Sequence, residues 1–163
     1  MATATGVFIN FDSLKDIKEK FKNLSTDAAK DVGAVLRTGA DSIASLARQN
    51  LSGVEYNQND YQKPLEKLYA KTNDITDLKQ RGINVNVVSL LSYEVIANRP
   101  YAAYIEFGTG GAVKIPAGVE DYAIQFKKPN RQNISMKANP YLFPALFQIK
   151  PQIIQDIEDV LTN

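Results

Sequence analysis

The chain has 163 residues, with 19 basic and 18 acidic side chains and a net charge of +1. The length suits a single domain, and the near balance of charge argues against a general nucleic-acid binder while remaining compatible with self-association. The sequence contains no Cys and no His, which excludes disulfides and every metal or catalytic site built on those side chains. Carboxylate, Lys or Tyr chemistry, or Mg²⁺ or Ca²⁺ held by oxygen atoms, remains as an enzymatic option.

The first residues lack a basic region followed by an apolar run, so we expect no signal peptide. The longest apolar runs are far shorter than the about 20 residues that span a membrane. We therefore expect a soluble protein that is made in a reducing cytoplasm and makes no membrane contact.

A short apolar run over residues 6–11 is either a strand or the lead-in to a helix. Leu14, Ile17, Phe21 and Leu24 then share one face at helical spacing, which predicts a short amphipathic helix.

A long helix is predicted to run to about Asn50 after a capping signal at Ser25, Thr26 and Asp27, because apolar residues recur at intervals of three and four. Gly33, Gly39 and many Ala residues keep this helix thin. We expect another helix or a sheet to approach it closely.

Residues 52–74 form a polar stretch rich in Asn, Gln, Ser and Tyr. Loops of this length are uncommon in compact domains and are usually functional or partly disordered. Tyr56, Tyr61 and Tyr69 are candidate contact residues, because Tyr combines a large apolar ring with a polar tip. The alternative is a solvated loop with a helical turn near Leu65.

A β-hairpin is predicted over residues 83–97, after one helical turn at 76–80. Residues 83–87 alternate apolar and Asn side chains, and residues 92–97 form the second strand. The connection lacks Asn-Gly or Asp-Gly, so the sequence leaves the register open.

The segment 99–111 is predicted to hold a short core helix with Pro100 in its first turn. Gly108 is expected to end that helix with a positive φ, and we expect Gly108→Val to block folding or assembly. The Gly-rich end lacks the Gly-Lys-Ser/Thr of a phosphate-binding loop. The expected apolar face consists of Tyr101, Tyr104, Ile105 and Phe107.

Residues 108–139 are expected to form an extended loop or arm. Pro116 can begin a helix whose face carries Val119, Tyr122, Ala123 and Phe126. The basic side chains of the arm suit contact with phosphates or with an acidic protein surface, and a solvated arm is the alternative. These side chains are Lys127, Lys128, Arg131 and Lys137.

The last helix is predicted to open near Asn139, with Pro144 in its first turn and Pro151 kinking or interrupting it.

Glu106 could act as a general base only if it were desolvated and given a partner. Glu120 and Asp121 are adjacent, so on a helix they point apart. We therefore expect that the protein is not an enzyme and that it binds no cofactor and no small-molecule substrate.

Two segments of the chain resemble a known family. Residues 101–109 read YAAYIEFGT and residues 139–146 read NPYLFPAL. The pair resembles the signature of the neck and tail-completion proteins of long-tailed bacteriophages, which include head–tail connector and tail terminator-like proteins. The matched residues are Tyr101, Tyr104, Glu106, Phe107, Gly108, Thr109, Pro140, Leu142, Pro144 and Leu146.

The resemblance implies a single α+β domain over residues 1–163, with a long N-terminal helix, an antiparallel hairpin or small sheet, a short central helix and a C-terminal helix packed on the sheet. It implies a virion protein that forms a homo-oligomeric ring, commonly of six copies, at the head–tail junction. Its partners would be the connector or head-closure protein and the tail tube, with genomic DNA passing through the lumen. The matched residues would have structural roles, and the alternative is a small nucleic-acid- or protein-binding module that uses the arm 127–137.

Overall fold

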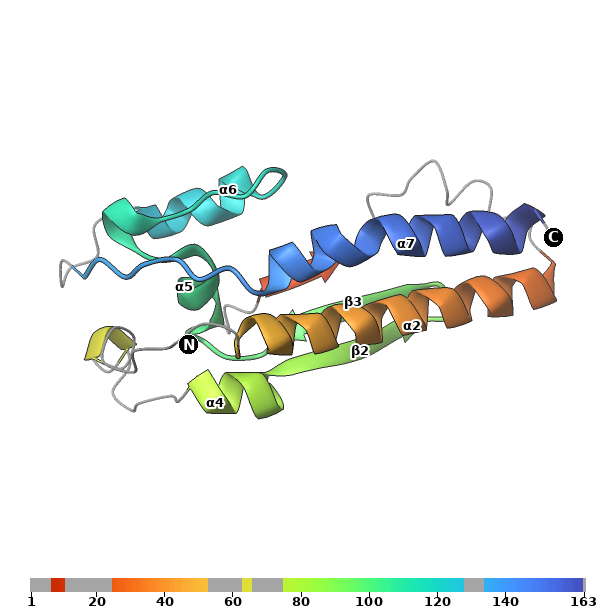
Figure 1. Cartoon of the computed structure of the whole chain (residues 1–163), viewed down its shortest axis with the longest axis horizontal. Helices are drawn as coiled ribbons and strands as arrows, with labels where there is room; N and C mark the ends of the chain where they lie inside the picture. The colour runs from red at the N-terminus through yellow and green to blue at the C-terminus, as the bar shows by residue number, and fades with distance from the viewer. Residues whose placement is uncertain (1–6, 11–24, 53–62, 66–74, 128–133, 163) are drawn as a thin grey trace.

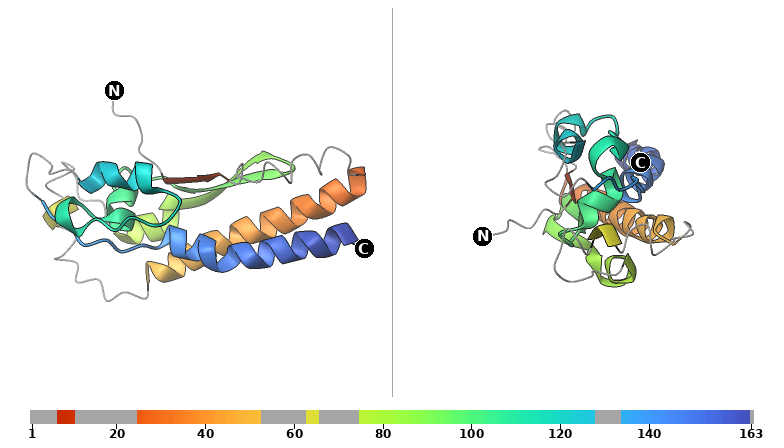
Figure 2. Two further views of the ribbon diagram at one scale, coloured as in Figure 1. Left: turned by 90° about the horizontal axis from the view of Figure 1, so that it is seen from above. Right: turned by 90° about the vertical axis from the view of Figure 1, so that its left-hand side faces the viewer.

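The computed structural model describes residues 7–10, 25–52, 63–65, 75–127 and 134–162. Two long helices lie side by side, and the first of them covers a small antiparallel sheet (Figures 1 and 2). This α+β arrangement confirms the predicted fold class, with the difference that the C-terminal helix packs mainly on the first long helix where packing on the sheet was expected. The elements in chain order are β1 (Val7–Asn10), α2 (Thr26–Asn50), α4 (Ile75–Asp77), the π-helical turn η2 (Leu78–Gly82), β2 (Ile83–Ser89), β3 (Ser92–Ala97), α5 (Ala102–Phe107), the 3₁₀ turn η3 (Gly110–Ala112), α6 (Glu120–Ala123), the 3₁₀ turn η4 (Ile124–Lys127) and α7 (Leu142–Thr162).

Helix α2 begins within the predicted capping signal of residues 25–27, with Ser25 as the cap. The hydroxyl of Ser25 accepts a hydrogen bond from the backbone N–H of Ala28 at 3.3 Å, which satisfies one of the free donors of the first turn. The buried stripe recurs at intervals of three and four, as an amphipathic helix requires. It consists of Val32, Gly33, Leu36, Gly39, Ala40, Ile43, Ala44 and Ala47.

The two glycines of α2 are the points of closest approach. A Cβ atom on Gly39 would lie 2.4 Å from Cδ1 of Ile153 in α7, and one on Gly33 would lie 2.6 Å from the carbonyl oxygen of Leu90. The predicted close approach is therefore confirmed on both sides of the helix, by α7 and by the turn of the hairpin.

The sheet has the order β1-β3-β2, and both pairings are antiparallel. In the hairpin Val85 lies opposite Val95, and β2 extends beyond the predicted strand to Ser89. Tyr93 and Val95 are buried on the face that packs on α2. Asn86 lies on the opposite face, where its side chain donates to the Glu94 carboxylate at 3.3 Å.

Helix α7 packs along α2, which in turn packs on β2 and β3 (Figure 1). The helix continues through Pro151 from Leu142 to Thr162, so an interruption there is wrong. Pro151 is exposed, and water can therefore satisfy the Phe147 carbonyl that loses its N–H donor.

Helix α6 begins at Glu120 instead of Pro116. Gly118 adopts a positive φ of 86°, which breaks the helical path between the two positions. The predicted face is otherwise present, since Ala123 and Phe126 are buried and Tyr122 is half-buried.

The predicted helix over residues 14–24 lies outside the described residues, and so does most of the loop 52–74. Within that loop Leu65 is buried and lies in a helical segment, of which residues 63–65 are described. None of the helices in the described ranges is both long and apolar enough to cross a membrane.

Candidate functional site

The two sequence motifs meet in space at one place, which we call the α5–α7 joint. It consists of residues 104–109 at the end of α5 and residues 134–143 at the start of α7. Figure 1 shows the chain leaving α5, passing through α6 and returning past α5 into α7. The joint therefore connects the middle of the chain to the last helix.

Glu106 lies at the centre of the joint and is fully buried, with 0% of its surface exposed. Its Oε2 atom accepts the backbone N–H groups of Tyr141 at 2.8 Å and Leu142 at 2.9 Å, and its Oε1 atom accepts that of Phe143 at 3.1 Å. These donors belong to the first turn of α7, where backbone N–H groups have no partner within the helix. Glu106 is thus an N-terminal cap that is supplied from a distant part of the chain.

Burial raises the pKa of the Glu106 carboxyl, and the three backbone N–H groups act in the opposite direction. Burial disfavours the charged form, whereas hydrogen bonds donated to the carboxylate favour it. The positive end of the α7 dipole also favours a carboxylate at this position. Both oxygen atoms are occupied by backbone donors, which suits a structural role.

Gly108 ends α5 with φ 76° and ψ −168°, a combination that is essentially restricted to glycine. A Cβ atom here would lie 2.6 Å from the carbonyl oxygen of Met136 and 2.7 Å from the backbone nitrogen of Ala138. The predicted positive φ is confirmed, and the returning chain adds a second reason for glycine.

Thr109 fixes the returning chain through both its backbone and its side chain. Its N–H donates to the Met136 carbonyl at 2.9 Å. Its hydroxyl accepts the Met136 N–H at 2.8 Å and donates to the Ile134 carbonyl at 2.9 Å. One turn earlier in α5, the carbonyl of Ile105 accepts the N–H of Asn139 at 2.8 Å. The segment that leads into α7 is therefore held on α5 at several successive points.

An aromatic cluster covers the joint. Phe107 stacks on Phe126 with ring centroids 5.5 Å apart, and it contacts Tyr122 at 5.6 Å and Phe143 at 5.7 Å. Tyr104 meets Phe126 edge to face at 5.3 Å. Such pairs contribute about 0.5–1.5 kcal/mol each beyond the area they bury, so the cluster holds α5, η4 and α7 together.

The remaining residues of the two motifs lie around the same joint. Tyr101 and Leu142 are fully buried, Pro140 and Leu146 are half-buried, and Pro144 is exposed in the first turn of α7. The structure thus brings the motif residues together around one buried carboxylate.

Sequence reasoning missed the partners of the joint. Asn50, at the end of α2, donates its side-chain N–H to the carbonyl of Tyr141 at 2.9 Å. The Tyr141 hydroxyl donates to the carbonyl of Ala102 at 3.5 Å. The sequence offered one indication of such a polar joint, which was Glu106 itself. A single acidic residue among apolar helix residues needs hydrogen-bond partners when it is buried.

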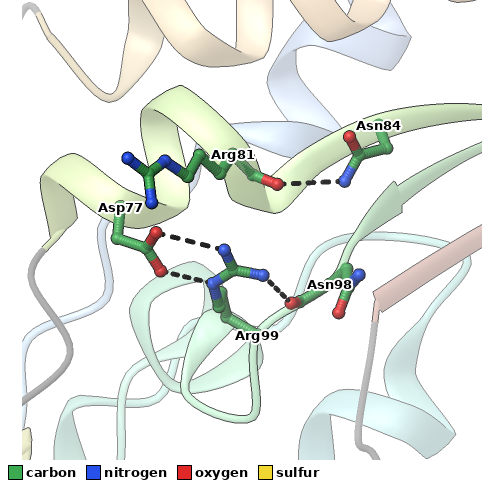
Figure 3. Close-up of polar contacts among 5 residues, drawn as sticks. All are labelled: Asp77, Arg81, Asn84, Asn98 and Arg99. Carbon is green, nitrogen blue, oxygen red and sulfur yellow. Dashed lines mark hydrogen bonds and ion pairs between the residues drawn. The ribbon is translucent and has the colours of Figure 1, made fainter.

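A second polar contact connects the segment before β2 to the segment before α5. Figure 3 shows the guanidinium of Arg99 facing the carboxylate of Asp77, with Nε–Oδ2 at 2.5 Å and Nη2–Oδ1 at 3.1 Å. Arg99 also donates to the Asn98 carbonyl at 2.8 Å. The hydrogen bond from Arg99 lowers the pKa of Asp77. This bidentate pair fixes both ends of the hairpin relative to each other.

The predicted interface residues are only partly described. Lys127 and Lys137 are exposed. Tyr56, Tyr61, Tyr69, Lys128 and Arg131 lie outside the described residues. Across the ranges that the structure covers, no cluster of three or more acidic side chains could hold a metal ion.

A protein-family model described as "Bacteriophage HK97-gp10, putative tail-component" matches residues 15–108, which is more than half of the chain. The match includes α2, the hairpin and α5 up to Gly108, and it ends before the second motif. No curated protein and no solved structure matches the chain significantly.

Proposed function

Because the chain belongs to the HK97 gp10-like family of bacteriophage tail components, it is a structural protein and not an enzyme, and we propose that it forms a ring at the head–tail junction. In this proposal the ring completes the tail and joins it to the head-side connector. The copy number would be six, as the resemblance implies.

The observation that carries the ring proposal is the exposed apolar end of the hairpin. Val87, Val88 and Leu90 have 61%, 56% and 50% of their surface exposed. Three large apolar side chains exposed within four positions of the chain make this end of the hairpin a candidate interaction surface. A head-to-tail contact between copies closes into a ring when the rotation between them allows it.

The partners would be the connector or head-closure protein on one side of the ring and the tail tube on the other, with genomic DNA passing through the lumen. We propose that the polar loop 52–74 and the arm 127–137 provide contacts with neighbouring copies or with these partners. Tyr side chains in the loop and basic side chains in the arm are suited to such contacts.

The proposal is tested by measuring the mass of the purified protein over a range of concentrations and by searching purified virions for the chain. We expect a closed oligomer and a fixed small copy number in each particle. A phage that lacks the protein should accumulate filled heads and tails that do not join. A strictly monomeric protein that is also absent from virions would contradict the proposal.

The alternative is a binding module that uses the basic arm on nucleic acid. This alternative predicts a salt-dependent affinity for DNA or RNA that is lost when Lys127, Lys128 and Arg131 are neutralised together. A ring protein whose assembly survives that triple change, and whose DNA affinity is negligible, excludes this alternative.

A further inference from the structure

Strand β2 is an edge strand that lacks charged residues and proline, two features that usually protect an edge. It lies at one side of the sheet, with β3 as its only strand neighbour in the described part of the chain (Figure 1). Its sequence, INVNVVS, has no charged residue and no proline. Natural proteins block exposed edges with Lys, Pro, bulges or a covering element, and here the irregularity comes only after Val87.

The register identifies which backbone groups face outward. The N–H of Asn98 donates to the carbonyl of Gly82, and hydrogen-bonded pairs alternate along an antiparallel ladder. Asn84 and Asn86 therefore bond to β3, whereas the N–H and C=O groups of Ile83, Val85 and Val87 point away from it.

The first outward carbonyl, that of Ile83, accepts a hydrogen bond from Arg48 at 2.6 Å. For Val85 and Val87, no described group bonds to the outward N–H or C=O. Unpaired groups at this alternation match the donors and acceptors of an added strand.

The chain itself carries a second edge strand on the other side of the same sheet. Strand β1, with the sequence VFIN, also has no charged residue or proline. Val95 lies opposite both Ile9 and Val85, and since its N–H and C=O groups do not bond to β2, they bond to Ile9 of β1. The backbone groups of the neighbouring residues Phe8 and Asn10 therefore point away from the sheet. Both edge strands run antiparallel to β3, so they run in the same direction.

We propose that the β2 edge binds the β1 edge of a neighbouring copy as a parallel strand addition, so that the sheets of the ring are continuous. This inference rests on the proposed ring. Rotation from one subunit to the next in a ring of several copies keeps the sense of the strands, so β1 of the neighbour runs parallel to β2. Pairing of β2 with β2 of a second copy would instead be antiparallel and two-fold, and would give a dimer.

The test compares Val87→Pro with Val87→Thr in the full chain. Proline at this position removes only the outward N–H, which an edge strand tolerates. Threonine is the control, because it keeps the N–H and the branched shape and only makes the side chain more polar. We expect wild type and Val87→Thr to form the ring and Val87→Pro to remain a folded monomer, as judged by mass and circular dichroism. If Val87→Pro does not fold, Val87→Lys replaces it, since this side chain is exposed and a charge opposes edge pairing.

Amide hydrogen exchange identifies the partner strand. The amides of Val85, Phe8 and Asn10 should exchange roughly tenfold or more slowly in the ring than in the monomeric variant. A ring that forms with Val87→Pro and leaves the Val85 amide in fast exchange overturns the strand addition but not the ring. Protection of β2 without β1, in a dimer, overturns the choice of β1. Absence of any ring, in solution and in virions, overturns the proposed function and this inference with it.

Discussion

The carboxylate of Glu106 accepts the backbone N–H of Tyr141 at 2.8 Å across 35 positions of the chain. Helix caps are usually local, from a residue next to the helix, whereas this one comes from a different helix. The start of α7 is therefore set by α5, and one buried side chain accepts the first free backbone donors of the last helix.

Replacing Glu106 with Gln should lower the free energy of unfolding by about 2 kcal/mol, the upper end of measured cap losses. Whether charged or protonated, the carboxyl group keeps two oxygen atoms that can accept hydrogen bonds, whereas the amide keeps one and turns its NH₂ group towards backbone donors. Chemical denaturation measures the change. Glu120→Gln is the control, since that exposed carboxylate accepts only local backbone N–H groups among the described residues, such as that of Gly118. Equal stability of the two variants would show that the distant cap contributes nothing.

The stability that Glu106 provides should depend on pH. Burial raises its pKa in the folded state above the ordinary value of 4.5, so folding takes up a proton between 4.5 and the raised value. The contribution is therefore fully present below 4.5 and falls as pH rises through that window. The difference in unfolding free energy between wild type and Glu106→Gln, measured across this range, should be largest at the acidic end. A difference that grows towards neutral pH would show that the N–H donors outweigh burial.

Replacing Gly108 with Ala should destabilise the protein by about 3 kcal/mol or more, from the positive φ and the contact with the returning backbone. Gly111→Ala is the matched control from the same Gly-rich segment, because nothing lies within 4 Å of a Cβ atom there. Thermal unfolding of the two variants measures the contrast. Gly108→Val should prevent folding or assembly altogether, and soluble, correctly assembled Gly108→Val protein would show that the joint tolerates a side chain.

The Asp77–Arg99 pair should contribute about 1 kcal/mol, the upper range for partly exposed ion pairs, since 35% of the Asp77 side chain is exposed. Arg99 lowers the pKa of Asp77 below 3.8. The contribution is therefore present above 3.8 and is lost as pH falls through the folded-state value. Asp77→Asn should be less stable than wild type at neutral pH and equal to it in strong acid. Arg99→Lys should show a partial loss, because lysine keeps the charge without the bidentate geometry.

Much of the fold follows from local chemistry in the sequence. Ser25 marks the start of α2, alternation marks both strands of the hairpin, and Gly108 marks the end of α5. Each of these features depends on a few neighbouring residues, so a single sequence can predict it. The sequence also predicted that another element approaches α2 closely, although not that α7 does so at Gly39, because a glycine in a helix interior usually has a packing reason.

The partners of Glu106 could not be predicted in the same way. They are backbone N–H groups, which every residue except proline carries, so no side-chain pattern marks them. The continuity of α7 through Pro151 depends on which side of the helix faces solvent, and that is decided by packing on α2. The start of α6 depends on the backbone of Gly118, which adopts a conformation that the sequence permits without requiring it.

The hydrogen bonds of Thr109 to Ile134 and Met136 have a consequence for how relatives of this protein can diverge. They bring together the two ends of the segment between these residues, so the path from α5 to α7 tolerates changes in that segment that keep Tyr122 and Phe126 in the aromatic cluster. Closing a longer loop costs little, about 0.6 kcal/mol for each doubling of its length. Insertions and deletions between Thr109 and Ile134 that spare Tyr122 and Phe126 should therefore accumulate faster than elsewhere, which would let phages adapt this segment to different neighbours while the two long helices stay in place.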